Sequence, residues 1–340
     1  MGPIENRSTF IINEGGLQLK ISRSKVGRIL LVSALAAAAV ACGDEESTAP
    51  AEAGAGIVLA VNPWTGSAVN AAVAKVVLEA NLNTAVTVLD IDEFATWPGM
   101  EDGSIDAVLE VWPSGHAADF ATYIDANKTV VSLGDLGPTA KIGWYVPTAV
   151  VTAHPELATW EGFKDPALAG LFATAETGDL GQFLMGDPTY VTFDEQIIAN
   201  LGLPLQYVVG GSEAALLTAI DNATAEAPVL VQFWKPHWKH LEADLTEVAL
   251  PAVTDECLAS AAAGDGGYAC DYAPDVLMKA ASAALQTKNA AAFDFLSAFQ
   301  LTTEQQSEIA GYVDRDLMKA DAAAAKWVAD NPDVVAAWLA

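Results

Sequence analysis

The stretch Ile105-Asp-Ala-Val-Leu-Glu-Val-Trp112 decides the fold, because it completes a repeating order of strands and helices. It follows a β-branched run at 57–61, an apolar-periodic segment at 68–82 and a second apolar run at 86–89. This order predicts a parallel α/β sheet with helices on both faces. Such sheets bind ligands at the carboxyl ends of their strands, and Trp64 and Trp112 both fall at that edge.

A second α/β unit follows in the chain. The segments 205–209 and 229–233 are expected strands, and Ser212 is expected to cap a periodic helix over 213–225. Another helix is expected to open at Asp187-Pro-Thr-Tyr190 and to run to residue 200. Aromatic motifs near strand ends in both units predict a ligand cleft between two lobes that close by a hinge. The other expected elements are an extended segment at 143–151, a strand at 171–174 and helices over 289–340.

Three short motifs place aromatic side chains beside Pro or Gly. They are Glu110-Val-Trp-Pro-Ser-Gly-His116, Gly186-Asp-Pro-Thr-Tyr190 and Gln232-Phe-Trp-Lys-Pro-His-Trp238. Ring faces that meet attract a cation without hydrogens to donate, such as a quaternary ammonium, and a nearby His can bind an anionic end. The motifs therefore predict a small zwitterion in an aromatic cage. Asp106 and Glu110 alternate with apolar residues and are expected at solvated strand positions.

The composition excludes several kinds of partner and site. The chain has 16 Lys and Arg against 44 Asp and Glu, which gives a net charge of −28. This charge repels phosphates, so no nucleic-acid partner is expected. With only 4 His, no metal site is expected, and no cofactor either. The sequence has no Gly-x-Ser-x-Gly elbow, His-Glu-x-x-His motif or phosphate loop, so it is not expected to be an enzyme.

The N-terminal residues predict export. Lys25 and Arg28 precede an apolar run at 29–40 that is short for a membrane span, which is the order of a secretory signal. The run ends in Ala39-Val-Ala-Cys42, which resembles a bacterial lipobox and implies diacylation of Cys42 and removal of residues 1–41. A plain signal peptide with a chance Cys is the alternative. Residues 42–56 then form a flexible tether, and the protein is expected in the periplasm or on the cell surface, with the membrane contacted only through the lipid.

Two further cysteines, Cys257 and Cys270, lie on either side of a Gly- and Ala-rich stretch. The oxidising exterior favours a disulfide between them that closes a small loop. A metal site is the alternative, although the segment contains no His.

The order and spacing of these motifs resemble those of the substrate-binding lipoproteins of ABC importers for glycine betaine, proline betaine and choline. The resemblance covers roughly residues 57–340 and includes Gly103-Ser-Ile-Asp106, Asn200-Leu-Gly-Leu203 and Gly211-Ser-Glu-Ala-Ala215. It implies an α/β fold of the two-lobed, periplasmic-binding-protein-like type II, with the ligand in a cleft between the lobes. We expect residues 57–146 with about 251–340 to form lobe 1, and about 147–250 to form lobe 2.

The resemblance also implies roles for individual residues. Trp112, Tyr190 and Trp234 match the box around a trimethylammonium group. The ligand carboxylate is expected at His116 and at the amides of Val191 and Thr192, because backbone amides at a helix start form an anion site. Tyr190 stands where members often have Trp, and a Cys that some members carry nearby is missing, so the identity of the ligand stays open. Further candidate ligand contacts are Trp64, His237 and one of Trp144 and Tyr145, which alternate along their strand.

The resulting interpretation is the extracytoplasmic substrate-binding component of an ABC transporter. It captures glycine betaine or a related quaternary ammonium solute, and it acts as a monomer that delivers the solute to a permease and its ATPase. A cell-surface hydrolase and a chemosensory receptor without transport are the alternatives.

Overall fold

The computed structural model describes residues 55–340, so the expected signal region, Cys42 and nearly all of the tether lie outside the described residues. Nine strands pair in the order β2-β1-β3-β9-β4-β7-β5-β6, with β8 paired to β4. The strands are β1 (Ile57–Val61), β2 (Val86–Asp90), β3 (Ala107–Val111), β4 (Val130–Pro147), β5 (Gly181–Met185), β6 (Leu205–Val209), β7 (Leu230–Lys235), β8 (Leu245–Val248) and β9 (Asp275–Ser282).

The first half-sheet consists of β2, β1, β3, β9 and the N-terminal part of β4. Strand β1 is parallel to both β2 and β3, as the sequence predicts, whereas β9 adds antiparallel to β3. All residues of β3 are buried, which suits a strand inside the sheet. Asp106 and Glu110 are only 2% and 3% exposed, so the expectation that they are solvated is wrong. Asp106 pairs with the Lys288 Nζ at 2.7 Å.

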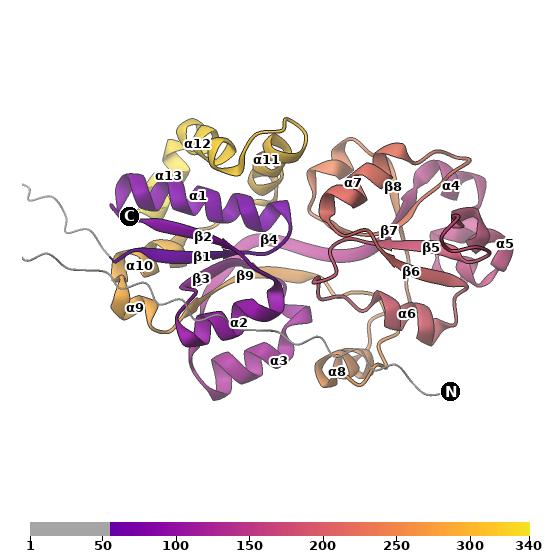
Figure 1. The fold of residues 1–340 in the computed structure, drawn as a ribbon, viewed down its shortest axis with the longest axis horizontal. Coiled ribbons are helices and arrows are strands. Elements are labelled where there is room, and N and C mark those ends of the chain that lie inside the picture. The colour runs from indigo at the N-terminus through magenta and orange to yellow at the C-terminus, as the bar shows by residue number, and fades with distance from the viewer. Residues whose placement is uncertain (1–54) are drawn as a thin grey trace, which may run out of the picture. The chain divides into compact units, whose positions relative to one another are not determined.

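Helices cover both faces of the first half-sheet, with α1, α11 and α12 on one face and α2 on the other (Figure 1). Gly103 ends α2 in the left-handed conformation, with φ 81°, and Thr302 opens α11 with a capping box. The α-helices are α1 (Thr65–Asn81), α2 (Glu93–Asp102), α3 (Ala117–Asp119), α4 (Thr148–Ala153), α5 (Pro166–Ala169), α6 (Asp194–Leu201), α7 (Glu213–Asn222), α8 (Asp255–Ala263), α9 (Leu285–Lys288), α10 (Ala290–Ala298), α11 (Thr303–Asp314), α12 (Ala320–Asp330) and α13 (Pro332–Trp338). The 3₁₀ helices are η1 (Pro113–Gly115), η3 (Pro155–Ala158), η4 (Trp160–Lys164), η5 (Gly170–Phe172) and η6 (Trp238–Leu241), and η2 (Phe120–Ala126) is a π-helix.

Strand β4 belongs to both halves of the sheet. Its residues 130–140 pair with β9, and its residues 141–147 pair with β7 and β8. The second half-sheet consists of this later part of β4 with β7, β5, β6 and β8. Within it, β5 is parallel to both β6 and β7. Each half-sheet has its own apolar core, centred on residues such as Trp327 in the first and Phe233 in the second.

The second half-sheet differs from the sequence expectations in three places. The helix expected from Asp187 begins only at Asp194, because the Asp187 side chain accepts hydrogen bonds from the amide and hydroxyl of Thr189 and closes a local turn instead. The strand expected at 171–174 is replaced by η5, and the strand of this region is β5. The segment expected to stay extended to 151 turns into α4 directly after Pro147.

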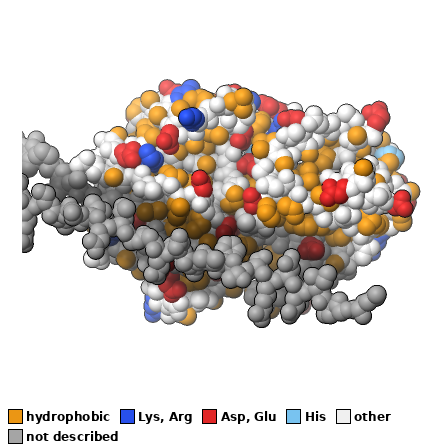
Figure 2. Space-filling model, in the orientation of Figure 1, with side chains coloured by type: hydrophobic (Ala, Val, Ile, Leu, Met, Phe, Trp, Pro, Cys, Tyr) orange, Lys and Arg blue, Asp and Glu red, His pale blue; other side chains and the backbone are white. Residues whose placement is uncertain are grey.

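Three further features concern the described residues. A disulfide joins Cys257 on α8 to Cys270, with a Cα–Cα distance of 6.3 Å. Among residues 55–340, no helix combines the length and the apolar character that crossing a membrane requires. Acidic side chains are scattered over the visible face and are not gathered into one patch (Figure 2).

Candidate functional site

One small cavity collects most of the aromatic residues that the sequence singles out. Its volume is about 40 Å³, which is larger than a single water needs and suits a small ligand. Both half-sheets contribute to its wall, which consists of Trp64, Glu93, Trp112, Ser114, Gly115, Ile142, Tyr190, Val191, Thr192, Gln232 and Trp234.

Four aromatic side chains form most of the apolar part of this wall. Trp64 precedes α1, Trp112 follows β3, Tyr190 lies in the loop before α6, and Trp234 lies within β7. The Tyr190 ring is 5.9 Å from Trp64 at 75° and 5.9 Å from Trp234 at 90°, so it stands edge-on between them. Rings so arranged present both faces and edges to one small volume.

A buried carboxylate orients two of these rings. Oε1 of Glu110 accepts hydrogen bonds from the indole Nε1 of Trp64 at 2.7 Å and of Trp112 at 3.1 Å. Its Oε2 accepts from the side-chain amides of Asn70 and Gln306, each at 2.7 Å. Burial raises the pKa of Glu110 to about 7, although these hydrogen bonds oppose the shift. The sequence analysis missed this role of Glu110. Glu110 and Trp112 are two residues apart along an extended segment, so their side chains point to the same face.

Tyr190 is also fixed by its polar end. Its hydroxyl donates to the backbone oxygen of Pro63 at 3.0 Å, across to the loop that carries Trp64. Burial, followed by the charge of Glu213, raises the pKa of Tyr190 well above its usual range. The phenol therefore stays protonated, and its ring stays free for contact with a ligand.

The polar side of the cavity is formed by Glu93 and the segment around Val191. Oε1 of Glu93 accepts the Val191 backbone N–H at 3.1 Å, and its Oε2 lies 2.8 Å from Nε2 of His116. The Val191 amide, expected to hold a ligand carboxylate, thus already carries a carboxylate of the protein. Val191 and Thr192 do line the cavity, but they precede the first residue of α6 and are not at the helix start itself.

His116 lies behind this wall. It is 3% exposed, and its ring nitrogens contact Glu93 and Asp119. Burial alone lowers the pKa of His116, but hydrogen bonds to Asp119 and Glu93 and their charges outweigh burial and raise the pKa to about 9. His116 does not line the cavity, and its ring nitrogens contact Glu93 in the wall and Asp119, so its contact with a ligand carboxylate stays a prediction.

Three other expected ligand contacts also lie elsewhere. Tyr145 is fully buried and donates to Glu247 at 3.2 Å, and Trp144 donates from Nε1 to Asp194 at 2.7 Å, so neither lines the cavity. His237 lines a neighbouring cavity and bonds Glu213 at 2.8 Å. The sequence analysis proposed one of Trp144 and Tyr145 from their alternation along a strand, and His237 from its aromatic motif. Each of the three has a carboxylate partner that is distant in the sequence.

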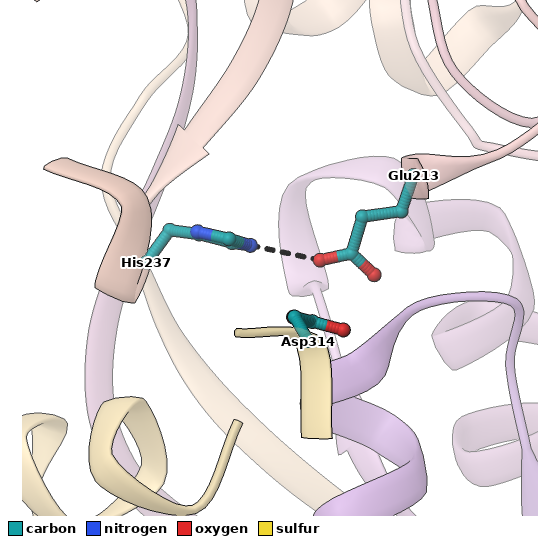
Figure 3. Close-up of side chains that lie close together, drawn as sticks. All are labelled: Glu213, His237 and Asp314. Carbon is teal, nitrogen blue, oxygen red and sulfur yellow. Dashed lines mark hydrogen bonds and ion pairs between the residues drawn. The ribbon is translucent and has the colours of Figure 1, made fainter. Parts of the chain in front are cut away.

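His237 belongs to a cluster with Glu213 and Asp314, whose ligand atoms lie within 4.8 Å of one another (Figure 3). Nδ1 of His237 accepts the backbone N–H of Lys239 at 3.0 Å, so Nε2 carries the proton of the neutral ring and donates it to Glu213. In the same cluster, Glu213 accepts a hydrogen bond from the Thr65 backbone N–H at 2.6 Å. Asp314 accepts one from the indole N–H of Trp238 at 2.8 Å. Its atoms therefore serve hydrogen bonds between the two half-sheets, and Nε2 has no lone pair for a metal.

Comparison with known proteins identifies relatives of this chain. Residues 55–330 match the family described as the substrate-binding domain of ABC-type glycine betaine transport systems. The trimethylamine N-oxide-binding protein of Pelagibacter ubique (strain HTCC1062) is 29% identical over 285 residues, which cover 82% of this chain and 88% of the relative.

Solved structures show the same fold. Lactococcal OpuAC, closed around glycine betaine, matches with a TM-score of 0.63 at 17% identity, over 84% of this chain and 99% of the other. ProX of Borrelia burgdorferi matches at 0.67 and 18% identity, over 84% and 97%. An ABC-transporter choline-binding protein in complex with choline matches at 0.66 and 20%, over 86% and 93%. These likenesses confirm the predicted α/β fold of periplasmic binding proteins. Since the family match spans well over half of its residues, this chain belongs to the substrate-binding domains of ABC-type glycine betaine transport systems.

Proposed function

We propose that this protein binds a small solute with a trimethylammonium group between the rings of Trp64, Trp112, Tyr190 and Trp234. The observation that carries this proposal is that all four rings line one small cavity. A desolvated contact between a cation and a ring face contributes on the order of 2 kcal/mol. A quaternary ammonium has no hydrogens to donate, so ring faces recognise it without requiring hydrogen-bond acceptors.

The charges around the cavity support a cationic ligand. The wall contains the carboxylate of Glu93, and among the described residues no Lys or Arg side chain lines it. Glu110 lies directly behind two of the rings. A cation in this cavity therefore meets quadrupoles and carboxylates, whereas a free anion finds no cationic partner in the wall.

The comparisons support the same class of ligand. The family consists of substrate-binding domains of an importer, so the protein is a binding component and not an enzyme. The relative from Pelagibacter ubique is named for trimethylamine N-oxide, a trimethylated nitrogen compound. We propose glycine betaine, choline, trimethylamine N-oxide and similar compounds as the candidates, and proline betaine and the sulfonium analogue as weaker ones.

Calorimetric titration of the purified protein with this panel tests the proposal. Trp112→Ala and Trp234→Ala should each weaken binding roughly thirtyfold, since about 1.4 kcal/mol corresponds to a tenfold change. Trp160→Ala is the matched control, because this Trp lies under Lys164 on η4 and not at the cavity. Folded variants that bind the panel as tightly as the parent exclude the aromatic cage.

Delivery and anchoring complete the proposal. The family implies a permease with its ATPase as the partner, and the sequence motif at Cys42 supports a lipid anchor outside the cytoplasm. The first half-sheet with the C-terminal helices serves as lobe 1, and the second half-sheet as lobe 2.

Cys42→Ala should release the protein from membranes or leave its signal uncleaved. Membrane retention with normal processing in this variant would exclude the anchor.

A further inference from the structure

The side chain of Gln232 is buried at the cavity wall without a partner. Gln232 is 2% exposed, and its Oε1 has no hydrogen-bond partner among residues 55–340. It lines the cavity together with Trp234, two residues further along β7. Residues two apart on a strand point to the same face, so the amide and the indole are presented together.

Other polar groups of the wall already have partners. Glu93 accepts the Val191 amide and contacts His116. The hydroxyl and the amide of Ser114 both donate to Asp275, at 2.7 and 3.0 Å. The Tyr190 hydroxyl donates to Pro63. Gln232 differs from these groups because its acceptor oxygen Oε1 has no partner among the described residues.

We propose that Oε1 of Gln232 accepts a hydrogen bond from the bound solute and selects trimethylammonium compounds whose polar end is a hydroxyl. This inference rests on the proposed function, because the same rings hold the cationic end. A hydroxyl can donate to Oε1, whereas an N-oxide oxygen and a carboxylate have no hydrogen to donate. A carboxylate brings a full charge against Glu93, which already occupies the Val191 amide.

The cost of an unpaired amide supports this assignment. A buried polar group without a partner destabilises the folded state. A purely structural Gln would be expected to bond its neighbours, as Gln182 on β5 accepts from Thr174 at 3.0 Å. Gln232 is therefore a specificity residue whose partner is the ligand.

The test measures binding of choline, trimethylamine N-oxide, glycine betaine and tetramethylammonium to the purified chain. Tetramethylammonium has the cationic head and no oxygen. Gln232→Leu should weaken choline binding roughly tenfold, the loss of about one hydrogen bond, and leave tetramethylammonium and N-oxide binding within twofold. In the wild-type protein, choline should bind more tightly than glycine betaine and the N-oxide.

Stability without ligand separates this role from a structural one. Because the amide is unpaired, Gln232→Leu and Gln232→Met should melt at the same temperature as the parent or higher. Gln182→Leu is the matched control, and it should lose stability while keeping the ligand preferences. Equal losses for tetramethylammonium and for choline, or a wild-type preference for glycine betaine or the N-oxide, overturn the inference about Gln232. Failure of every compound, tetramethylammonium included, to bind the wild-type protein overturns the proposed function instead.

Discussion

The indole Nε1 of Trp64 donates a 2.7 Å hydrogen bond to Oε1 of Glu110, so a buried carboxylate on β3 orients a cavity ring that comes from the loop before α1. The same oxygen holds Trp112, and the other oxygen holds Asn70 and Gln306. One side chain thus receives four donors from three parts of the chain. The shape of the cavity therefore depends on a residue that does not line it.

Glu110→Gln should weaken both the fold and ligand binding. A glutamine side chain has one acceptor oxygen and one NH₂ group. Its NH₂ group would face either the two indoles or the amides of Asn70 and Gln306, which are donors as well. Leaving buried donors unpaired should lower the free energy of unfolding by about 1–3 kcal/mol per group. Urea unfolding and calorimetric titration measure both effects. Glu256→Gln, on the exposed side of α8, is the control and should change neither. Unchanged ligand affinity in a folded Glu110→Gln protein would show that the rings keep their orientation without this carboxylate.

The sequence predicted the strands β1, β2, β3, β6 and β7 because these segments are rich in apolar and β-branched residues and are bounded by clear turn or cap residues. It missed β5, a five-residue strand without β-branched residues, and it opened α6 too early. Asp187 and Thr189 form an N-cap-like pattern in the sequence, but their hydrogen bonds close a turn. Local patterns cannot distinguish a cap from a turn when both use the same donors and acceptors.

The aromatic half of the site was predictable and the polar half was not. The sequence analysis identified three aromatic residues by their position near Pro or Gly, and all three line the cavity: Trp112, Tyr190 and Trp234. His116 and His237 were expected beside them, but Glu93 and Glu213 bind these rings from distant positions in the sequence. The pairing of a buried charge depends on tertiary contacts, which residue spacing does not reveal.

His116 should make the stability of the protein fall as the pH rises above neutrality. Its pKa is raised from 6.5 to about 9, so the native state holds a proton that the unfolded chain releases between these values. The stabilisation is complete below pH 6.5 and is lost as the pH rises through about 9. It amounts to on the order of 3 kcal/mol. Urea unfolding across pH 6–10 should show this slope in the parent and not in His116→Asn. His154→Asn, at a partly exposed position, is the control, and equal slopes in all three proteins contradict the prediction.

The disulfide between Cys257 and Cys270 should stabilise α8 without affecting the ligand. It spans 13 residues, and closing a loop of about this size contributes roughly 3 kcal/mol in the chain-entropy view. Mass spectrometry of the unreduced protein should find the two residues linked. The Cys257→Ala, Cys270→Ala double variant should unfold at lower urea and bind ligand with unchanged affinity. Two free thiols after purification without reductant, or a double variant as stable as the parent, count against a structural bond.

Glu213 should control how long the ligand stays bound, because it caps a helix of the other half-sheet. Helix α1 has no acidic residue in its first turn and no side-chain cap, and its Thr65 amide donates to Glu213 at 2.6 Å. A cap of this kind contributes about 0.5–2 kcal/mol. If this contact holds the lobes closed, Glu213→Ala should raise the dissociation rate of the ligand roughly tenfold with little change in the association rate. Stopped-flow tryptophan fluorescence measures both rates. Glu195→Ala is the matched control, since Glu195 also lies in a first helical turn but is exposed. Equal dissociation rates in the two variants would mean that Glu213 stabilises only its own half.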